Sequence, residues 1–211
     1  MQMDIEEYER LSDPLRWEKD VNGRIAATKE KGLENPNLLL GSSTFVMWKG
    51  IEQALGIPNA VNHSFGGSTV YDILYYLDKL VLDFAPKSLV VCSGDNDIAR
   101  GRRPLLVAHD CIMLAKLVWY SYPETKLAFV SIKASAARWD FKKEQEETNR
   151  IAREFCEGDD RLRYLDIVPA MTPDGQKPED ELFLEDGLHL SEKGYENWRQ
   201  ALVPQLVGFA G

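Results

Sequence analysis

The sequence predicts an α/β protein with a parallel sheet covered by helices on both faces, and three observations support this prediction. Short apolar runs alternate along the chain with longer segments of helical periodicity. The runs at 88–94 and 126–132 are almost continuously apolar, as is typical of central strands buried on both faces. Because a helical segment separates each strand from the next, the strands are expected to run parallel.

The elements are expected in strict alternation. The predicted strands are 37–41, 59–64, 88–94, 126–132 and 162–167. Between them, helices are expected at 44–55, 69–82, 102–122 and 138–156, and a last helix at 191–209. An N-terminal helix is predicted to begin after Asp13 as N-cap, with Pro14 at its first position and Gly32 as its stop. The 168–185 segment contains three prolines and is expected to be a surface loop.

Composition limits the class of protein. A chain of 211 residues fits one domain, so we expect a single domain over 1–211, with 1–35 as an N-terminal helical segment packed on it. The net charge of −9 opposes binding to nucleic acid and to anionic lipid surfaces. The first residues have no basic and apolar leader, and no apolar run reaches a membrane-spanning length. We therefore expect a cytoplasmic protein without stable membrane insertion.

The three cysteines indicate neither a disulfide framework nor a metal site. Cys92, Cys111 and Cys156 are odd in number and lack the CxxC spacing of thiolate zinc sites. Free cysteines are commonly buried, so reduced interior thiols are expected. The histidine spacings do not resemble a metal site either, and no cofactor or metal is predicted.

Small and hydrogen-bonding residues follow several predicted strands. "GSST" follows the first strand, "NHSFGGST" spans the end of the second, and "SGDNDI" spans the end of the third. In a parallel sheet the carboxyl ends of the strands share one edge, where ligands bind. A serine of "GSST" can cap the next helix or present a hydroxyl to a ligand. The backbone N–H of Gly67 and the amide of Asn96 can stabilise a developing oxyanion.

"DGLH" supplies a carboxylate and an imidazole three residues apart. One turn of helix-like backbone would bring Asp186 and His189 to the same side. The carboxylate can then hold one ring nitrogen while the other accepts a proton from a serine. Taken alone, such a pair is also found as a surface turn; together with the serines it predicts nucleophilic catalysis.

In this order, the four stretches resemble the SGNH hydrolases, the superfamily also called GDSL esterases and lipases. The resemblance places Ser43 of "LLLGSSTFVMW" at the nucleophile position and Asp186 and His189 of "DGLHL" as its partners. It implies an oxyanion hole formed by the N–H of Ser43, Gly67 and Asn96. The implied fold is a three-layer α/β/α, flavodoxin-like five-stranded parallel sheet of order 2-1-3-4-5.

Two further stretches, "SIKASAARW" and "ELFLEDGLHLSEKGYENW", resemble the subgroup close to platelet-activating-factor acetylhydrolase catalytic subunits. The sequence departs from the family pattern in reading "GSS" where many relatives read GDS, so Ser42 stands at the acidic position. His63 and Ser64 also replace the residues expected before "FGGS", which bears on substrate preference.

The activity implied is that of a serine esterase or acylhydrolase acting on short acyl esters, most simply acetyl esters. Phe65 and Trp139 are the large apolar residues expected near the site, and Arg102, Arg103 and Arg138 would favour a polar or anionic substrate. The expected partner is a small acyl ester, and a homodimer is left open. Two alternatives remain: an acyltransferase using the same site, and a non-catalytic flavodoxin-like ligand-binding protein.

Overall fold

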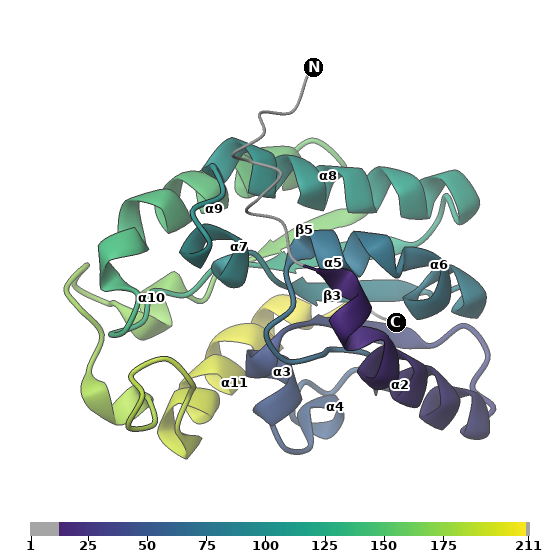
Figure 1. Cartoon of the computed structure of the whole chain (residues 1–211), viewed down its shortest axis with the longest axis horizontal. Helices are drawn as coiled ribbons and strands as arrows, with labels where there is room; N and C mark the ends of the chain where they lie inside the picture. The colour runs from purple at the N-terminus through teal and green to yellow at the C-terminus, as the bar shows by residue number, and fades with distance from the viewer. Residues whose placement is uncertain (1–12, 210–211) are drawn as a thin grey trace.

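A five-stranded parallel sheet forms the centre of the computed structural model, which describes residues 13–209. Its strands are β1 (Asn37–Gly41), β2 (Ala60–Asn62), β3 (Ser88–Cys92), β4 (Lys126–Val130) and β5 (Leu162–Leu165). The order β2-β1-β3-β4-β5 confirms the predicted fold class and strand order (Figure 1). Residues 1–12 of the predicted N-terminal segment lie outside the described residues.

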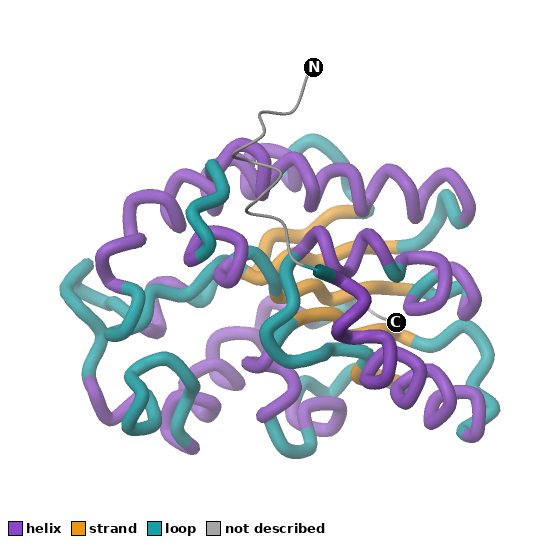
Figure 2. The backbone as a smooth tube through the Cα atoms, viewed as in Figure 1, coloured by secondary structure: helices purple, strands orange, loops and turns teal. Residues whose placement is uncertain are grey.

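Helices cover both faces of the sheet (Figure 2). The helices packed on one face are α2 (Glu18–Glu30), α5 (Val70–Tyr75), α6 (Leu77–Leu80), α7 (Asp95–Ala99), α8 (Pro104–Ser121) and α9 (Lys142–Cys156). Those on the other face are α3 (Ser43–Met47), α4 (Ile51–Ala54), α10 (Val168–Met171) and α11 (Glu192–Leu206). Short 3₁₀ turns occupy Pro14–Trp17, Leu82–Phe84, Trp139–Phe141 and Asp180–Leu182.

β1 is buried on both faces, as a central parallel strand should be. Leu38 and Leu40 belong to the core on one face and Leu39 to the core on the other, and all three are 0% exposed. β1 pairs with β2 on one side and β3 on the other. The chain order reverses at this strand, so the segment after Gly41 begins at a topological switch point, where open parallel sheets bind ligands.

The predicted helix 44–55 is in fact two short helices. The chain is extended at Trp48, with ψ 94°, and Gly50 adopts a left-handed conformation with φ +66°. Trp48 and Ile51 are still buried, and both pack in the same core as Phe45. The apolar spacing therefore identified the buried residues correctly but not the break.

Two further segments differ from their predictions. The helix predicted at 69–82 is divided into α5 and α6, and the segment 168–185, predicted as a surface loop, contains α10. α7 was not predicted, because its residues "DNDIA" are mostly polar and resemble a turn. The N-terminal helix begins as expected: Asp13 accepts a hydrogen bond from the N–H of Leu15 at 3.1 Å, and Pro14 follows. None of the helices within residues 13–209 combines the length and apolar character needed to cross a membrane.

Candidate active site

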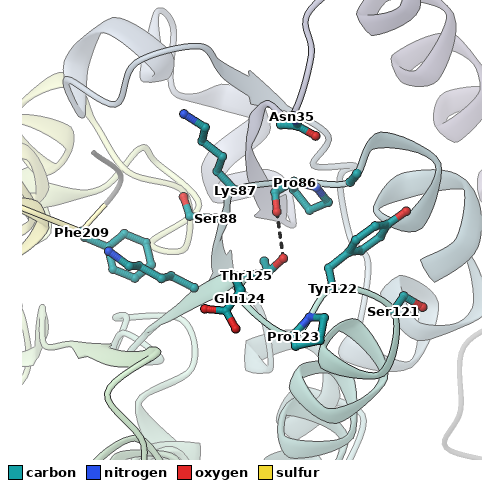
Figure 3. Close-up of a pocket in the computed structure, with 12 residues that line it drawn as sticks. Asn35, Pro86, Lys87, Ser88, Ser121, Tyr122, Pro123, Glu124, Thr125 and Phe209 are labelled. Carbon is teal, nitrogen blue, oxygen red and sulfur yellow. Dashed lines mark hydrogen bonds between the residues drawn. The ribbon is translucent and has the colours of Figure 1, made fainter.

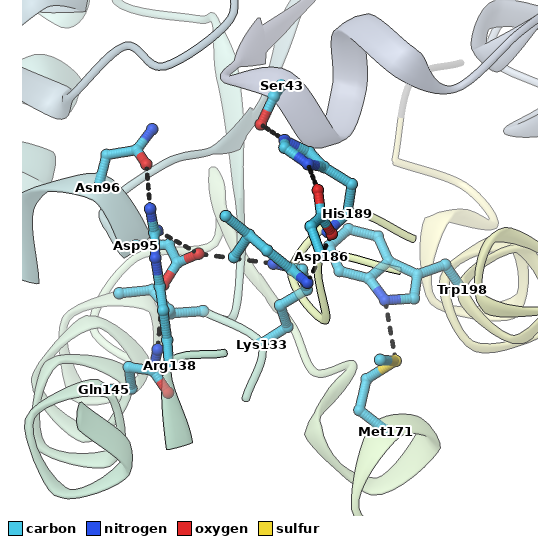
Figure 4. A network of polar contacts seen from close by, with 12 residues as sticks. Ser43, Asp95, Asn96, Lys133, Arg138, Gln145, Met171, Asp186, His189 and Trp198 are labelled. Carbon is cyan, nitrogen blue, oxygen red and sulfur yellow. Dashed lines mark hydrogen bonds and ion pairs between the residues drawn. The ribbon is translucent and has the colours of Figure 1, made fainter. Parts of the chain in front are cut away.

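Ser43, His189 and Asp186 form a continuous hydrogen-bonded chain at the carboxyl edge of the sheet (Figure 4). His189 Nε2 lies 3.1 Å from Ser43 Oγ, and His189 Nδ1 lies 2.6 Å from Asp186 Oδ2. An ionised carboxylate only accepts hydrogen bonds, so the proton of the neutral ring belongs on Nδ1. Nε2 is then free to accept the hydroxyl proton of Ser43, which is the arrangement of a nucleophile and its base.

The Asp186 carboxylate is held by three hydrogen bonds. Besides the His189 ring, Asp186 Oδ1 accepts the N–H groups of Leu188 and His189, each at 2.9 Å. The ring hydrogen bond, reinforced by these two backbone donors, lowers the pKa of Asp186 to about 2. The carboxylate is therefore ionised at any pH at which the protein would be assayed, and it can stabilise a protonated His189.

The Asp186–His189 segment is a tight turn rather than the helical turn that was predicted. Gly187 has φ +64°, and its carbonyl accepts the N–H of Ala137 at 3.0 Å. A Cβ at Gly187 would stand 3.3 Å from the Cβ of Ala136, so glycine permits both the left-handed backbone and the close approach. The turn is closed by a bridge between Phe183 and Leu190.

Contacts between α3 and α11 fix the distance from Ser43 to His189. The Tyr195 hydroxyl on α11 donates to the carbonyl of Thr44 at 2.9 Å. The Trp48 ring lies 5.1 Å from that of Tyr195 and 6.3 Å from that of Trp198. α11 begins three residues after His189, so this aromatic packing holds the segments that carry Ser43 and His189 against each other.

The two adjacent serines have different surroundings. Ser43 is the first residue of α3, is partly exposed and contacts His189, whereas Ser42 is 8% exposed and precedes the helix. The carbonyl of Ser42 accepts the N–H groups of Phe45 and Val46, both at 3.1 Å. Ser42 also lines a small cavity of about 20 Å³ together with Cys92. Of the two hydroxyls, that of Ser43 lies beside a base.

The loops after β2 and β3 contact each other at the end of β1. Phe65 N–H and Ser68 Oγ both donate to the carbonyl of Gly41, at 3.0 and 3.1 Å, which holds the loop containing Gly67 against the end of β1. Asn96 Nδ2 donates to the carbonyl of Ser68 at 2.9 Å. Gly67 and Asn96, the two predicted oxyanion donors, therefore lie on segments tied to each other and to β1.

α7 is anchored by the acidic residues on both sides of Asn96. Asp97 is 0% exposed, accepts Val70 N–H at 3.1 Å and pairs with Arg102 at 3.2 Å. Burial raises the pKa of Asp97 to about 6, against the opposing effect of Arg102. Asp95 pairs with Arg138 at 2.8 Å. One buried and one partly buried ion pair therefore orient the helix that carries Asn96.

Several of the residues predicted to contact the substrate are buried or paired with other side chains. Phe65 is 1% exposed and packs against Trp17, at 5.9 Å between ring centroids, so its side chain offers no surface to a substrate. Arg102 is also buried in ion pairs. Arg138 faces Asp95 and Asn96. Trp139, half-buried under Lys142, and the exposed Arg103 stay candidate substrate contacts. The position of Phe65 next to a motif in the sequence did not indicate that its side chain points into the core.

A cavity of about 460 Å³ lies at the other edge of the sheet (Figure 3). It is lined by the starts of β3 and β4, including Ser88 and Lys126, together with Phe209. None of the predicted site residues lines this cavity. Within residues 13–209, no group of three or more His, Cys, Asp or Glu side chains is arranged so that it could bind a metal ion.

The sequence model of the GDSL-like Lipase/Acylhydrolase family matches residues 40–196, a range that includes Ser43, Asp186 and His189. The chain therefore belongs to this family of acylhydrolases and esterases, also called SGNH hydrolases. No curated protein shows significant sequence similarity to the chain.

Solved structures share its fold at low sequence identity. A Streptococcus pneumonia protein described as a platelet activating factor is 19% identical with a TM-score of 0.76, over 93% of this chain and 94% of that one. A GDSL-like lipase from Bacteroides thetaiotaomicron is 18% identical with a TM-score of 0.70, over 92% and 97%. A catalytic mutant of an acetylxylan esterase from Geobacillus stearothermophilus is 14% identical with a TM-score of 0.67, over 83% and 94%.

Proposed function

We propose that the protein is a serine esterase that cleaves short-chain acyl esters, with Ser43 as nucleophile, His189 as general base and Asp186 as the carboxylate that orients it. The observation that carries the proposal is the hydrogen-bonded chain from Ser43 Oγ through both ring nitrogens of His189 to Asp186. A nucleophile, a base and an orienting carboxylate in sequence define this chemistry on unrelated folds.

In the acylation step, Ser43 Oγ attacks the ester carbonyl carbon and its proton passes to His189 Nε2. The imidazolium is stabilised by Asp186, whose carboxylate is already ionised. The tetrahedral oxyanion is bound by the N–H groups of Ser43 and Gly67 and by the amide of Asn96. The bond to the leaving alcohol then breaks, and His189 returns the proton to the alcohol oxygen.

Deacylation repeats these steps with water. His189 takes a proton from a water molecule as the water oxygen attacks the acyl carbon of the Ser43 ester. The same donors hold the second oxyanion, and the proton returns to Ser43 Oγ as the acyl–oxygen bond breaks. Ser43 is the first residue of α3, where backbone N–H groups lack intrahelical acceptors and the helix dipole is positive, so its own N–H suits this task.

The short acyl chain is proposed from the limited apolar surface on the site segments. Phe65, one of the two large apolar residues predicted near the site, is buried in the core. On α3 and on the Phe183–Leu190 turn, the exposed large apolar side chains are Met47 and Leu184. Each buried methylene contributes about 0.8 kcal/mol, so a long acyl chain needs a much longer apolar groove. One structural relative is an acetylxylan esterase by its description, which agrees with small acyl groups.

The test compares p-nitrophenyl acetate hydrolysis by the wild type, Ser43→Ala and Ser42→Ala. Loss of the nucleophile is expected to lower kcat by several orders of magnitude. Ser42→Ala is the matched control, since it removes the same hydroxyl one residue away, and it should keep a substantial part of the activity. Equal activity of Ser43→Ala and wild type would contradict the proposal.

A further inference from the structure

Both ends of the Asn96 side-chain amide are held by hydrogen bonds. Figure 4 shows the one between its oxygen and Arg138. Its Nδ2 donates to the carbonyl of Ser68 at 2.9 Å, and its Oδ1 accepts from Arg138 Nη2 at 3.0 Å. If the amide turned over, its NH₂ group would face the guanidinium and its oxygen would face another carbonyl oxygen. The two contacts therefore select one orientation. Nδ2 carries two N–H bonds, and one remains for a ligand.

Arg138 is itself held in place by a second set of contacts. Its Nη1 lies 2.8 Å from Asp95 Oδ2, and the side chains of both residues are less than one-fifth exposed, at 18% and 19%. Asp95 Oδ1 accepts Gln145 Nε2 at 3.0 Å, and Lys133 Nζ lies 3.5 Å from Asp95 Oδ2. A planar guanidinium can contact Asp95 and Asn96 through different nitrogens at once, which an ammonium group does not reproduce.

These contacts join two separate segments of the chain. Asp95 and Asn96 are neighbours at the start of α7, whereas Arg138 comes from the segment after β4, 42 residues beyond Asn96. The same segment donates Ala137 N–H to the carbonyl of Gly187, inside the turn that carries Asp186 and His189. Arg138 thus lies between the oxyanion side of the site and the base side.

We infer that Arg138 is a positioning residue, fixed by Asp95, that orients and polarises the Asn96 amide as an oxyanion donor. This inference rests on the proposed function, because it assigns a role within the same esterase site. A positive charge 3.0 Å from Oδ1 draws electron density from the amide and strengthens its N–H as a donor. The oxyanion exists only on the reaction path, so the effect falls on kcat and not on KM.

The experiment is a double-mutant cycle with p-nitrophenyl acetate, a neutral ester that needs no cation for binding. The variants are Arg138→Met, Asn96→Ala and the two combined. Asn96→Ala is expected to lower kcat by roughly 10²–10³-fold, as removal of an oxyanion donor does elsewhere. Arg138→Met is expected to lower kcat on the order of 10–100-fold with KM nearly unchanged. In the Asn96→Ala background, Arg138→Met should cost less than about twofold more.

Two further variants serve as controls for folding and for the loss of a surface charge. Arg138→Lys retains the charge and should fold even if Arg138→Met does not. Since it loses the two-sided contact, it should still lower kcat in the wild-type background and have little effect in the Asn96→Ala background. Arg150→Met is the matched control: Arg150 is on the exposed face of α9, paired with Glu147 and Glu154, and its loss should leave kcat unchanged.

The outcomes separate this inference from the proposed function. An equal fall in kcat with and without Asn96 would overturn the inference, because Arg138 would then act independently of the amide. A raised KM at constant kcat would also overturn it and return Arg138 to substrate binding. In both cases labelling of Ser43 by a fluorophosphonate would persist, whereas wild-type protein that is neither labelled nor active would overturn the proposed function itself.

Discussion

His189 Nε2 lies 3.1 Å from Ser43 Oγ, although 146 residues separate the two along the chain. The contact depends on the sheet order, since Ser43 follows the inner strand β1 and the turn carrying His189 leads into α11 on the same face. Trp48 and Tyr195 pack between these two helical segments, with ring centroids 5.1 Å apart. The same aromatic core that stabilises this face of the sheet therefore sets the geometry of the site.

The rate on an activated ester is expected to rise from pH 5 to pH 8, since a general base accepts the proton of Ser43 only in its unprotonated form. Asp186 contributes nothing to this rise: its pKa is lowered to about 2, so it stays ionised above that pH. The measurement is kcat/KM for p-nitrophenyl acetate from pH 5 to pH 8. Asp186→Asn should lower the rate sharply, because the ring loses its orienting acceptor. A flat profile with acylation limiting would count against His189.

Catalytic efficiency should be highest for acetyl to butyryl esters. The measurement is kcat/KM across p-nitrophenyl esters of increasing chain length, together with a search for a rate jump at an oil–water interface. Each methylene bound in an apolar groove would add about 0.8 kcal/mol, close to fourfold in affinity. Efficiency that climbs steadily through dodecanoate would mean that the protein has an extended apolar groove.

Stability is expected to fall on acidification because of His63. This ring is 0% exposed, with Nδ1 2.7 Å from the carbonyl of Leu80 and Nε2 2.8 Å from Thr28 Oγ1. Burial lowers its pKa from 6.5 to about 4. On acidification the unfolded chain thus binds the proton at a higher pH than the folded protein does. The contribution of neutral His63 to the free energy of unfolding is complete above pH 6.5 and is lost as pH falls to about 4.

The loss attributable to His63 is about 3 kcal/mol, from the size of its pKa shift. Urea unfolding of wild type and His63→Gln at pH 7 and pH 4 measures it. His63→Gln should show a smaller pH dependence than the wild type, while His109→Gln, at an exposed position on α8, should match the wild type. Identical pH dependence in all three proteins would show that His63 does not carry the effect.

Much of the fold was accessible from sequence because its strands are short apolar runs. The predicted strands 37–41, 88–94 and 126–132 each contain the observed strand, since burial on both faces leaves little room for polar residues. The break at Trp48 and the short helix α7 were missed, because they depend on single backbone conformations and not on periodicity. The strand order came from the family resemblance rather than from the composition of the strands.

The sequence predicts those contacts of the site that form between residues of one short motif. Asp186 and His189 are three residues apart and contact each other directly, although through a turn with Gly187 in a left-handed conformation rather than a helix. The contact of Arg138 with Asn96 spans 42 residues and is set by how the segment after β4 meets α7. Nothing local in "SAARWD" indicates that this arginine faces inward while Trp139 stays half-exposed.

The central claim, that Ser43 is a nucleophile activated by His189, is tested most directly by covalent labelling. A fluorophosphonate reacts with an activated serine, and intact-protein mass spectrometry counts the adducts. We expect one adduct on the wild type and on Ser42→Ala, and none on Ser43→Ala or His189→Ala on the same time scale. Labelling that survives Ser43→Ala and disappears in Ser42→Ala would contradict the account.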